Sequence, residues 1–241
     1  MEIAEKHLQK RACPQCASPS AHGKRKHYGA SAWQMTQCQQ CGLVYLGTVL
    51  NPEYLFTDFS WEKTSKKEEK KREKTHGFLR RISRMTRSRM RLLPRKSVPV
   101  LIERFLPNGG DVLDVGCGDG WQIASLPAKF RPHGIEISTD LSQKAKSLLS
   151  AKGGSVVNHD ALNGLREISG GSMDIILMRS FLEHEIHPKE VVEQCYRVLR
   201  PGGTVIIKVP NYGCLNRHVR GAKWCGFRFP DHVNYFTPQT L

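Results

Sequence analysis

Residues 112–120 read VLDVGCGDG, and this stretch decides the fold. The apolar residues Val112, Leu113 and Val115 predict a buried strand, and the glycines at 116, 118 and 120 predict a tight turn after it. The bare peptide groups of such a turn, with the N-terminus of the next helix, predict a ligand-binding loop. The loop is no dinucleotide fingerprint, because Trp121 stands where that motif needs its last glycine. It is no P-loop either, because no Gly-Lys-Ser/Thr follows.

Further strands and helices alternate along the chain after this stretch. The expected strands cover residues 112–115, 133–137, 155–158, 173–178 and 204–209. The expected helices cover residues 121–129, 139–151 and 188–199. Apolar strands separated by helices predict an α/β fold with a doubly wound, mostly parallel, Rossmann-like sheet. Ligands of such sheets bind at the carboxyl ends of the strands.

The length and composition of the chain leave room for this domain and one smaller module. At 241 residues, of which 39% are hydrophobic, the chain can bury the core of one α/β domain. No apolar stretch approaches the roughly 18 residues of a membrane span, and the opening MEIAEKHLQKR lacks the apolar core of a signal peptide. The eight cysteines are therefore expected to be thiols and metal ligands rather than disulfides, and the location is expected to be cytoplasmic.

Two Cys-x-x-Cys pairs mark an N-terminal module, predicted over residues 1–58. The pairs are Cys13 with Cys16 and Cys38 with Cys41, and 21 residues separate them. Four thiolates match the tetrahedral preference of zinc, so the pairs predict a zinc ribbon with these four ligands. A closed four-cysteine site leaves no position for water, which makes the zinc structural rather than catalytic.

The basic charge belongs to one segment, predicted as a helical linker over residues 59–98. Residues 62–96 hold 15 of the 37 basic residues and four of the 22 acidic ones. This segment therefore carries +11 of the chain's net charge of +15. Phe78, Ile82, Met85 and Leu92 recur there at helical spacing. The plainest interpretation is a helix that docks its apolar side on the next domain. An anion-binding lid, a nucleic-acid contact and attachment to an acidic membrane surface stay open as alternatives.

Two acids stand at the ends of the second and third strands. Glu136 comes twenty residues after Gly116, where a carboxylate can accept both hydroxyls of a ribose. Asp160 follows the third strand, where a carboxylate could accept a hydrogen bond from an adenine amino group. Each alone is as well explained as a surface acid, but the two together predict a nucleoside pocket.

With these residues assembled, the region 111–209 resembles the class I S-adenosylmethionine-dependent methyltransferases. The matching pieces are VLDVGCGDG, the acid in GIEIS, HDA at 159–161, MDIILMRSFLEH at 173–184 and LRPGGTVIIKVP at 199–210. The resemblance implies that residues 99–241 form the catalytic domain. It further implies that Asp114, Gly116 and Gly118 hold the methionine part of the cofactor, Glu136 the ribose and Asp160 the adenine.

The zinc ribbon and the ending PDHVNYFTPQTL also resemble, more loosely, bacterial methyltransferases of sugar and cell-surface polysaccharide biosynthesis. This resemblance implies a small-molecule acceptor such as a nucleotide-linked sugar, with arginines able to pair with its phosphates. A hydroxyl acceptor must lose a proton, and His184 is the first candidate for the base, with His232 the second. Alternatively, Glu183, His184 and His187 could bind a divalent ion.

Two other functions remain open. An RNA methyltransferase, acting for example on ribosomal RNA, would explain the basic segment. A truncated, cofactor-binding domain without turnover would explain the end of the chain, because the fold normally adds two strands after the fifth. Thr237 and Pro238 predict a helix that begins just as the sequence stops. The fifth strand would then be an exposed edge through which two copies could associate.

Overall fold

A computed structural model describes residues 8–19, 24–26, 33–51 and 97–241 of the chain. The chain divides into two compact units, one of residues 10–48 and 98–241 and the other of residues 1–9 and 49–97. The first unit holds almost all of the described elements. Strands β1 (Leu8–Lys10) and β5 (Thr48–Leu50) form a two-stranded sheet. The predicted basic helix at 62–96 lies outside the described residues.

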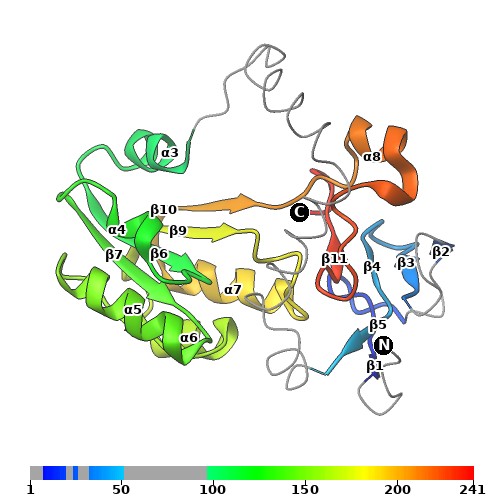
Figure 1. The fold of residues 1–241 in the computed structure, drawn as a ribbon, viewed down its shortest axis with the longest axis horizontal. Coiled ribbons are helices and arrows are strands. Elements are labelled where there is room, and N and C mark those ends of the chain that lie inside the picture. Colours follow the sequence, from blue (N-terminus) through cyan, green and yellow to red (C-terminus); the bar gives the residue numbers. More distant parts are fainter. Residues whose placement is uncertain (1–7, 20–23, 27–32, 52–96) are drawn as a thin grey trace, which may run out of the picture. The chain divides into compact units, whose positions relative to one another are not determined.

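Five parallel strands form the central sheet, in the spatial order β10-β9-β6-β7-β8 (Figure 1). They are β6 (Gly110–Val115), β7 (Phe130–Ile135), β8 (Val156–Val157), β9 (Met173–Arg179) and β10 (Leu199–Lys208). The first of them in the sequence, β6, is central, and the strand order runs outward from it in both directions. This is the topology of a doubly wound sheet, so the predicted fold class is confirmed. Strand β10 lies at the edge, as predicted for the fifth strand.

Helices cover both faces of this sheet. They are α3 (Val98–Phe105), α4 (Trp121–Ala124), α5 (Thr139–Ser150), α6 (Ala161–Glu167) and α7 (Pro188–Val198). Val112 and Ile175 point to the face that α3, α4 and α5 bury, whereas Leu113 and Ile176 point to the face that α6 and α7 bury. Side chains alternate along a strand, so each strand contributes to two cores. At Gly120 a Cβ would lie 3.0 Å from that of Ala145, so glycine there lets α4 approach α5.

The predicted elements differ from the observed ones at several places. The first helix ends at Ala124 rather than 129, because Pro127 has no N–H to continue the helical ladder. Helix α6 was not predicted, although Asp160 caps it by accepting a hydrogen bond from the Asn163 amide. At Thr237, where the sequence predicts the beginning of a helix, residues 238–240 form a single turn, and the amides of Thr240 and Leu241 both donate to the Thr237 carbonyl.

A second sheet holds the second cysteine pair in the turn between two of its strands and takes its last strand from the far end of the chain. It is antiparallel, in the order β11-β4-β3-β2 (Figure 1). The strands are β2 (Lys24–Lys26), β3 (Met35–Gln37), β4 (Val44–Leu46) and β11 (Asn234–Tyr235). Before β11 the chain forms the short helix α8 (Leu215–Arg220) and a 3-10 turn η3 (Gly221–Lys223). After β10 the described chain adds β11 to this antiparallel sheet (the ribbon sheet), and no described residues supply the two further strands that this fold normally adds to its central sheet.

Among the helices of the described residues, none is both long and apolar enough to cross a membrane.

Candidate cofactor and acceptor site

The glycine loop at residues 116–120 follows β6 with a left-handed backbone at all three glycines. The φ angles are +74° at Gly116, +60° at Gly118 and +76° at Gly120. A Cβ at Gly116 would lie 3.0 Å from the Phe181 ring, whereas a Cβ at Gly118 would meet nothing within 4 Å. A ligand can therefore approach the bare peptide groups at Gly118, which is where the sequence predicts the cofactor.

Glu136 is fastened to this loop. It follows β7 directly and is 8% exposed. Its Oε2 accepts a hydrogen bond from the Gly118 amide at 2.8 Å, and its Oε1 accepts one from the Ser138 amide at 2.9 Å. The predicted ribose-binding carboxylate thus stands beside the open glycine, at the carboxyl edge of the sheet.

Asp160 lies at the same edge, because β8 runs parallel to β7 and beside it. Its carboxylate accepts hydrogen bonds from the Asn163 amide at 3.0 Å and from His159 Nδ1 at 2.7 Å. Partial burial acts to raise the pKa of Asp160, but these hydrogen bonds outweigh it and lower the pKa below its ordinary value. An ionised acceptor therefore stands where the sequence predicts the adenine contact.

Asp114 is the most deeply buried acid of the site, at 1% exposure. Its Oδ2 lies 2.5 Å from Nη2 of Arg179, at the end of β9, and the same guanidinium also donates to the Gln122 side chain on α4. Burial raises the pKa of Asp114 to about 6, and the charge of Arg179 opposes that rise. Asp114 is thus mainly ionised at neutral pH. The pattern of glycines and acids gave no signal for Arg179.

The two candidate bases, His184 and His232, come together from distant parts of the chain. Their rings pack edge to face with centroids 4.7 Å apart. Nδ1 of His184 lies 3.0 Å from the Asp231 carbonyl, and Nδ1 of His232 lies 2.8 Å from the Gly226 carbonyl. Carbonyls only accept hydrogen bonds, so each Nδ1 is the donor and each Nε2 of the neutral ring is an acceptor. Burial lowers the pKa of His184 to about 4, so this ring is neutral at pH 7.

Glu183 completes a group that could hold a divalent cation. One ligand atom from each of Glu183, His184 and His232 lies within 4.8 Å of the others. Oε2 of Glu183 is buried and has no hydrogen-bond partner among the described residues. His187, which the sequence analysis grouped with Glu183 and His184, lies outside this group of ligand atoms. It directly precedes α7, and its Nδ1 lies 3.2 Å from Oε1 of Glu190.

Replacing Glu183 with glutamine is expected to stabilise the protein at high pH only. Burial raises the pKa of Glu183 from 4.5 to about 7, so the folded protein binds a proton that the unfolded chain has lost. The free energy of unfolding therefore falls as the pH rises from 4.5 to 7. Glu183→Gln should gain about 3 kcal/mol at pH 8 and nothing at pH 4. Urea unfolding at both pH values measures this, with the exposed Glu190→Gln as control. A variant that is less stable than the wild type at pH 8 would contradict the expectation.

Two side chains that the sequence did not indicate, the buried Asn234 and the half-buried Arg11, hold the loop of residues 182–186, which carries Glu183 and His184. Asn234 is 1% exposed and donates from Nδ2 to the carbonyls of Leu182 (2.8 Å) and Glu185 (2.6 Å). Arg11, three residues after β1 begins, donates to the carbonyls of Leu46, Ile186 and Val233 and to Oδ1 of Asn234. The ribbon and the loop after β9 are therefore joined by hydrogen bonds.

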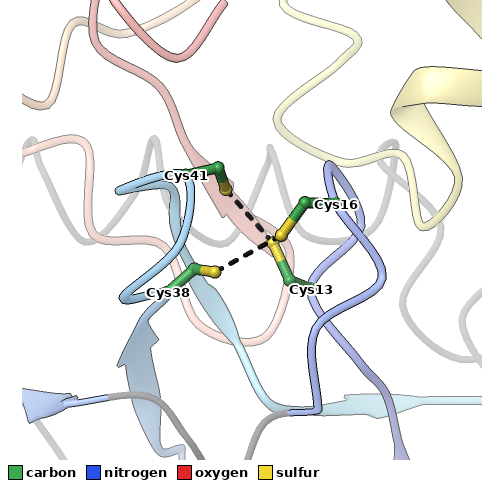
Figure 2. A group of neighbouring side chains, drawn as sticks. All are labelled: Cys13, Cys16, Cys38 and Cys41. Carbon is green, nitrogen blue, oxygen red and sulfur yellow. Dashed lines mark hydrogen bonds between the residues drawn. The ribbon is translucent and has the colours of Figure 1, made fainter.

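The four predicted zinc ligands converge. Figure 2 shows their side chains pointing toward one another, and the Sγ atoms all lie within 4.8 Å. The Cys13–Cys41 and Cys16–Cys38 sulfur pairs are 3.5 Å apart, close to the roughly 3.8 Å that tetrahedral Zn–S bonds of about 2.3 Å require. Hydrogen bonding with Ser18 lowers the pKa of Cys16 to about 6, whereas burial raises the pKa of Cys13 and Cys41, so the thiolate form of these two depends on a bound cation.

The two cysteine turns share one backbone pattern. In the first, the Ala17 amide donates to the Cys13 carbonyl, and in the second the Gly42 amide donates to the Cys38 carbonyl. The residue directly after each Cys-x-x-Cys pair has a positive φ angle, +59° at Ala17 and +78° at Gly42. Each turn thereby directs two thiols to one point, and the residues fit a four-coordinate ion.

Comparisons with known proteins find a family model and several similar methyltransferases. A family model described as "Methyltransferase domain" matches residues 80–241. The ubiquinone biosynthesis O-methyltransferase of Cupriavidus pinatubonensis is 35% identical over 149 residues, which cover 55% of this chain and 57% of that protein. The tRNA (carboxymethyluridine(34)-5-O)-methyltransferase of Arabidopsis thaliana is 35% identical over 105 residues, covering 43% and 25%. A SAM-dependent methyltransferase structure from Archaeoglobus fulgidus is 22% identical with a TM-score of 0.46, covering 59% and 63%.

The chain spans about three fifths of the length of the ubiquinone biosynthesis O-methyltransferases it matches. The matched part covers 57% of the protein from Cupriavidus pinatubonensis and 61% of the one from Paraburkholderia xenovorans. The matched region contains the glycine loop, both strand-end acids and the loop after β9.

Proposed function

The chain belongs to the family of methyltransferase domains whose model matches residues 80–241, and we propose that it transfers a methyl group from S-adenosylmethionine to a hydroxyl group of a small-molecule acceptor. The observation that carries this proposal is the bond between Glu136 and the Gly118 amide. It holds a carboxylate that is suited to binding a ribose against an open glycine loop, and Asp114 and Asp160 lie at the same edge of the sheet. This combination suits a nucleoside with an amino-acid end.

S-adenosylmethionine supplies a methyl group on a positively charged sulfur, which a nucleophile can displace directly. The protein has to bind and orient both reactants, and it has to take the proton of a hydroxyl acceptor. His184 suits the second task, because its Nδ1 donates to the Asp231 carbonyl and its Nε2 accepts. His232, packed edge to face against it, remains the second candidate base.

The similar proteins named as O-methyltransferases support an oxygen acceptor, and they act on acceptors of different classes. The low pKa of His184 favours an acidic hydroxyl, because a weak base takes a proton most readily from a stronger acid. A phenolic hydroxyl meets this condition better than an alcohol of a nucleotide-linked sugar, so the phenol is the first acceptor to test and the sugar the second.

The experiment has two stages. Calorimetry tests binding of S-adenosylmethionine to the whole chain, and labelled methyl transfer is then screened on ubiquinone precursors, nucleotide-linked sugars, tRNA and ribosomal RNA. Label on a small molecule supports the proposal. Label on RNA alone would establish the RNA methyltransferase alternative instead. Cofactor binding without transfer to any of them would favour a binding domain.

Replacing His184 with alanine is expected to lower methyl transfer at least 100-fold and to leave cofactor binding within about threefold. His187→Ala is the matched control, because His187 lies three residues further on and is exposed at the start of α7. Turnover by His184→Ala at the wild-type rate would remove this residue as the base and leave His232.

We further propose that Cys13, Cys16, Cys38 and Cys41 hold a structural zinc ion. The convergence of their sulfurs and the paired turns support it. Four protein ligands leave no open position, so the ion would hold the ribbon sheet together and take no part in methyl transfer.

A further inference from the structure

Arg179 ends strand β9, and the alternation of side chains along the strand directs it to the predicted cofactor site. On β9, Ile175 and Leu177 point into the core under α3, α4 and α5, so Arg179 follows them on the same face. On β6, Val112 points into that core as well, and Asp114 follows it. Asp114 pairs in register with Leu177. The carboxylate of Asp114 and the guanidinium of Arg179 therefore lie side by side next to this apolar core, at the carboxyl edge of the sheet.

The guanidinium bridges the two elements that flank the glycine loop. Nη2 lies 2.5 Å from Oδ2 of Asp114, on the strand before the loop, and Nη1 donates to Gln122, on the helix after it. The third nitrogen, Nε, is buried and has no hydrogen-bond partner among the described residues. A buried, charged donor without an acceptor is costly, so a ligand oxygen at this nitrogen would be favourable.

The methionine end of S-adenosylmethionine complements this pair. It carries an ammonium and a carboxylate on one carbon, and these groups match a carboxylate and a guanidinium that lie side by side. Arginine presents its donors in a planar fork that suits a carboxylate. We propose that Arg179 is a cofactor-binding residue that recognises the carboxylate of the methionine end, while Asp114 receives the ammonium group.

The inference rests on the proposed cofactor, and ligands that lack the carboxylate test it directly. The probes are S-adenosylmethionine, decarboxylated S-adenosylmethionine, which keeps the amine, and 5′-methylthioadenosine, which lacks both groups. Calorimetry on the wild-type chain is expected to show S-adenosylmethionine binding at least about tenfold more tightly than its decarboxylated form.

Arg179→Met should remove this preference. We expect it to weaken S-adenosylmethionine binding at least about tenfold and to change 5′-methylthioadenosine binding less than about threefold. Arg179→Lys keeps the positive charge but loses Nε and the planar fork of donors. Its affinity for S-adenosylmethionine should therefore lie between those of the wild type and Arg179→Met. Arg200→Met is the matched control, because Arg200 bridges Asp174 (2.5 Å) and Asp111 (3.0 Å) at the opposite, amino edge of the same strands. It should leave the preference unchanged.

Equal weakening of all three ligands by Arg179→Met would overturn the inference, because it would mean that Arg179 only braces the loop. If Arg179→Met does not fold, the wild-type comparison decides, and equal affinity for the two sulfonium ligands overturns the inference while leaving the cofactor in place. Failure of the wild type to bind S-adenosylmethionine at all would overturn both.

Discussion

Replacing Cys38 with serine is expected to abolish binding of the proposed zinc ion and to unfold the ribbon sheet together with β11. A structural zinc contributes roughly 10 kcal/mol or more to the folding of such modules, far more than their small cores supply. Cys38 is 4% exposed, and its sulfur lies 3.5 Å from that of Cys16. The loss of one thiolate would therefore open the whole cluster.

The effect should extend to the loop that carries His184. Strand β11 pairs with β4 through Asn234 and Tyr235, and Asn234 holds the loop of residues 182–186. In Cys38→Ser, amide hydrogen exchange at residues 44–46, 182–186 and 233–235 should accelerate, and metal analysis should find less than one zinc per chain. The exposed Cys225→Ser is the control and should change neither. Native protection at residues 233–235 in a metal-free variant would contradict the coupling.

Replacing Gly118 with alanine is expected to abolish most cofactor binding at little cost in stability. The glycine has φ +60°, and a Cβ there meets no protein atom within 4 Å. The left-handed backbone costs an alanine about 1 kcal/mol. The added methyl group would occupy the open space against the loop, so affinity for S-adenosylmethionine should fall by at least about tenfold, or 1.4 kcal/mol.

Gly171 offers a matched control for this variant. It has φ +62° and equally open surroundings, but it lies before β9, at the amino edge of the sheet. Gly171→Ala should lose the same stability as Gly118→Ala in a thermal melt and keep the wild-type affinity in calorimetry. If both variants bind S-adenosylmethionine like the wild type, the cofactor does not lie against Gly118.

Local chemistry was sufficient to predict the elements that flank the site. The apolar run at 112–115 became β6, and the glycines that follow it adopt the positive φ angles that a tight turn requires. The acid after the second strand was also predictable, because consecutive parallel strands end at the same edge. Helix α6 could have been found from Asp160 as a helix cap, which was interpreted only as a ligand contact.

Contacts between distant segments were not predictable in the same way. Arg11 and Val233 are 222 residues apart, and Asn234 lies 52 residues from Leu182. Their partners are backbone carbonyls, which every residue has, so no residue type in the sequence marks them. Strand β11 was not predicted either, because its partner β4 lies far away in the sequence.

The glycine loop, the strand-end acids, the cysteine pairs and the parallel sheet were predictable, because each follows from residue type and spacing over a short range. The pairing of Arg179 with Asp114, the packing of His184 against His232 and the hydrogen bonds to the loop after β9 became evident only in the folded chain. Such pairings depend on which strands become neighbours. That choice is made by the burial of the two faces of the sheet as a whole, and no local pattern contains it.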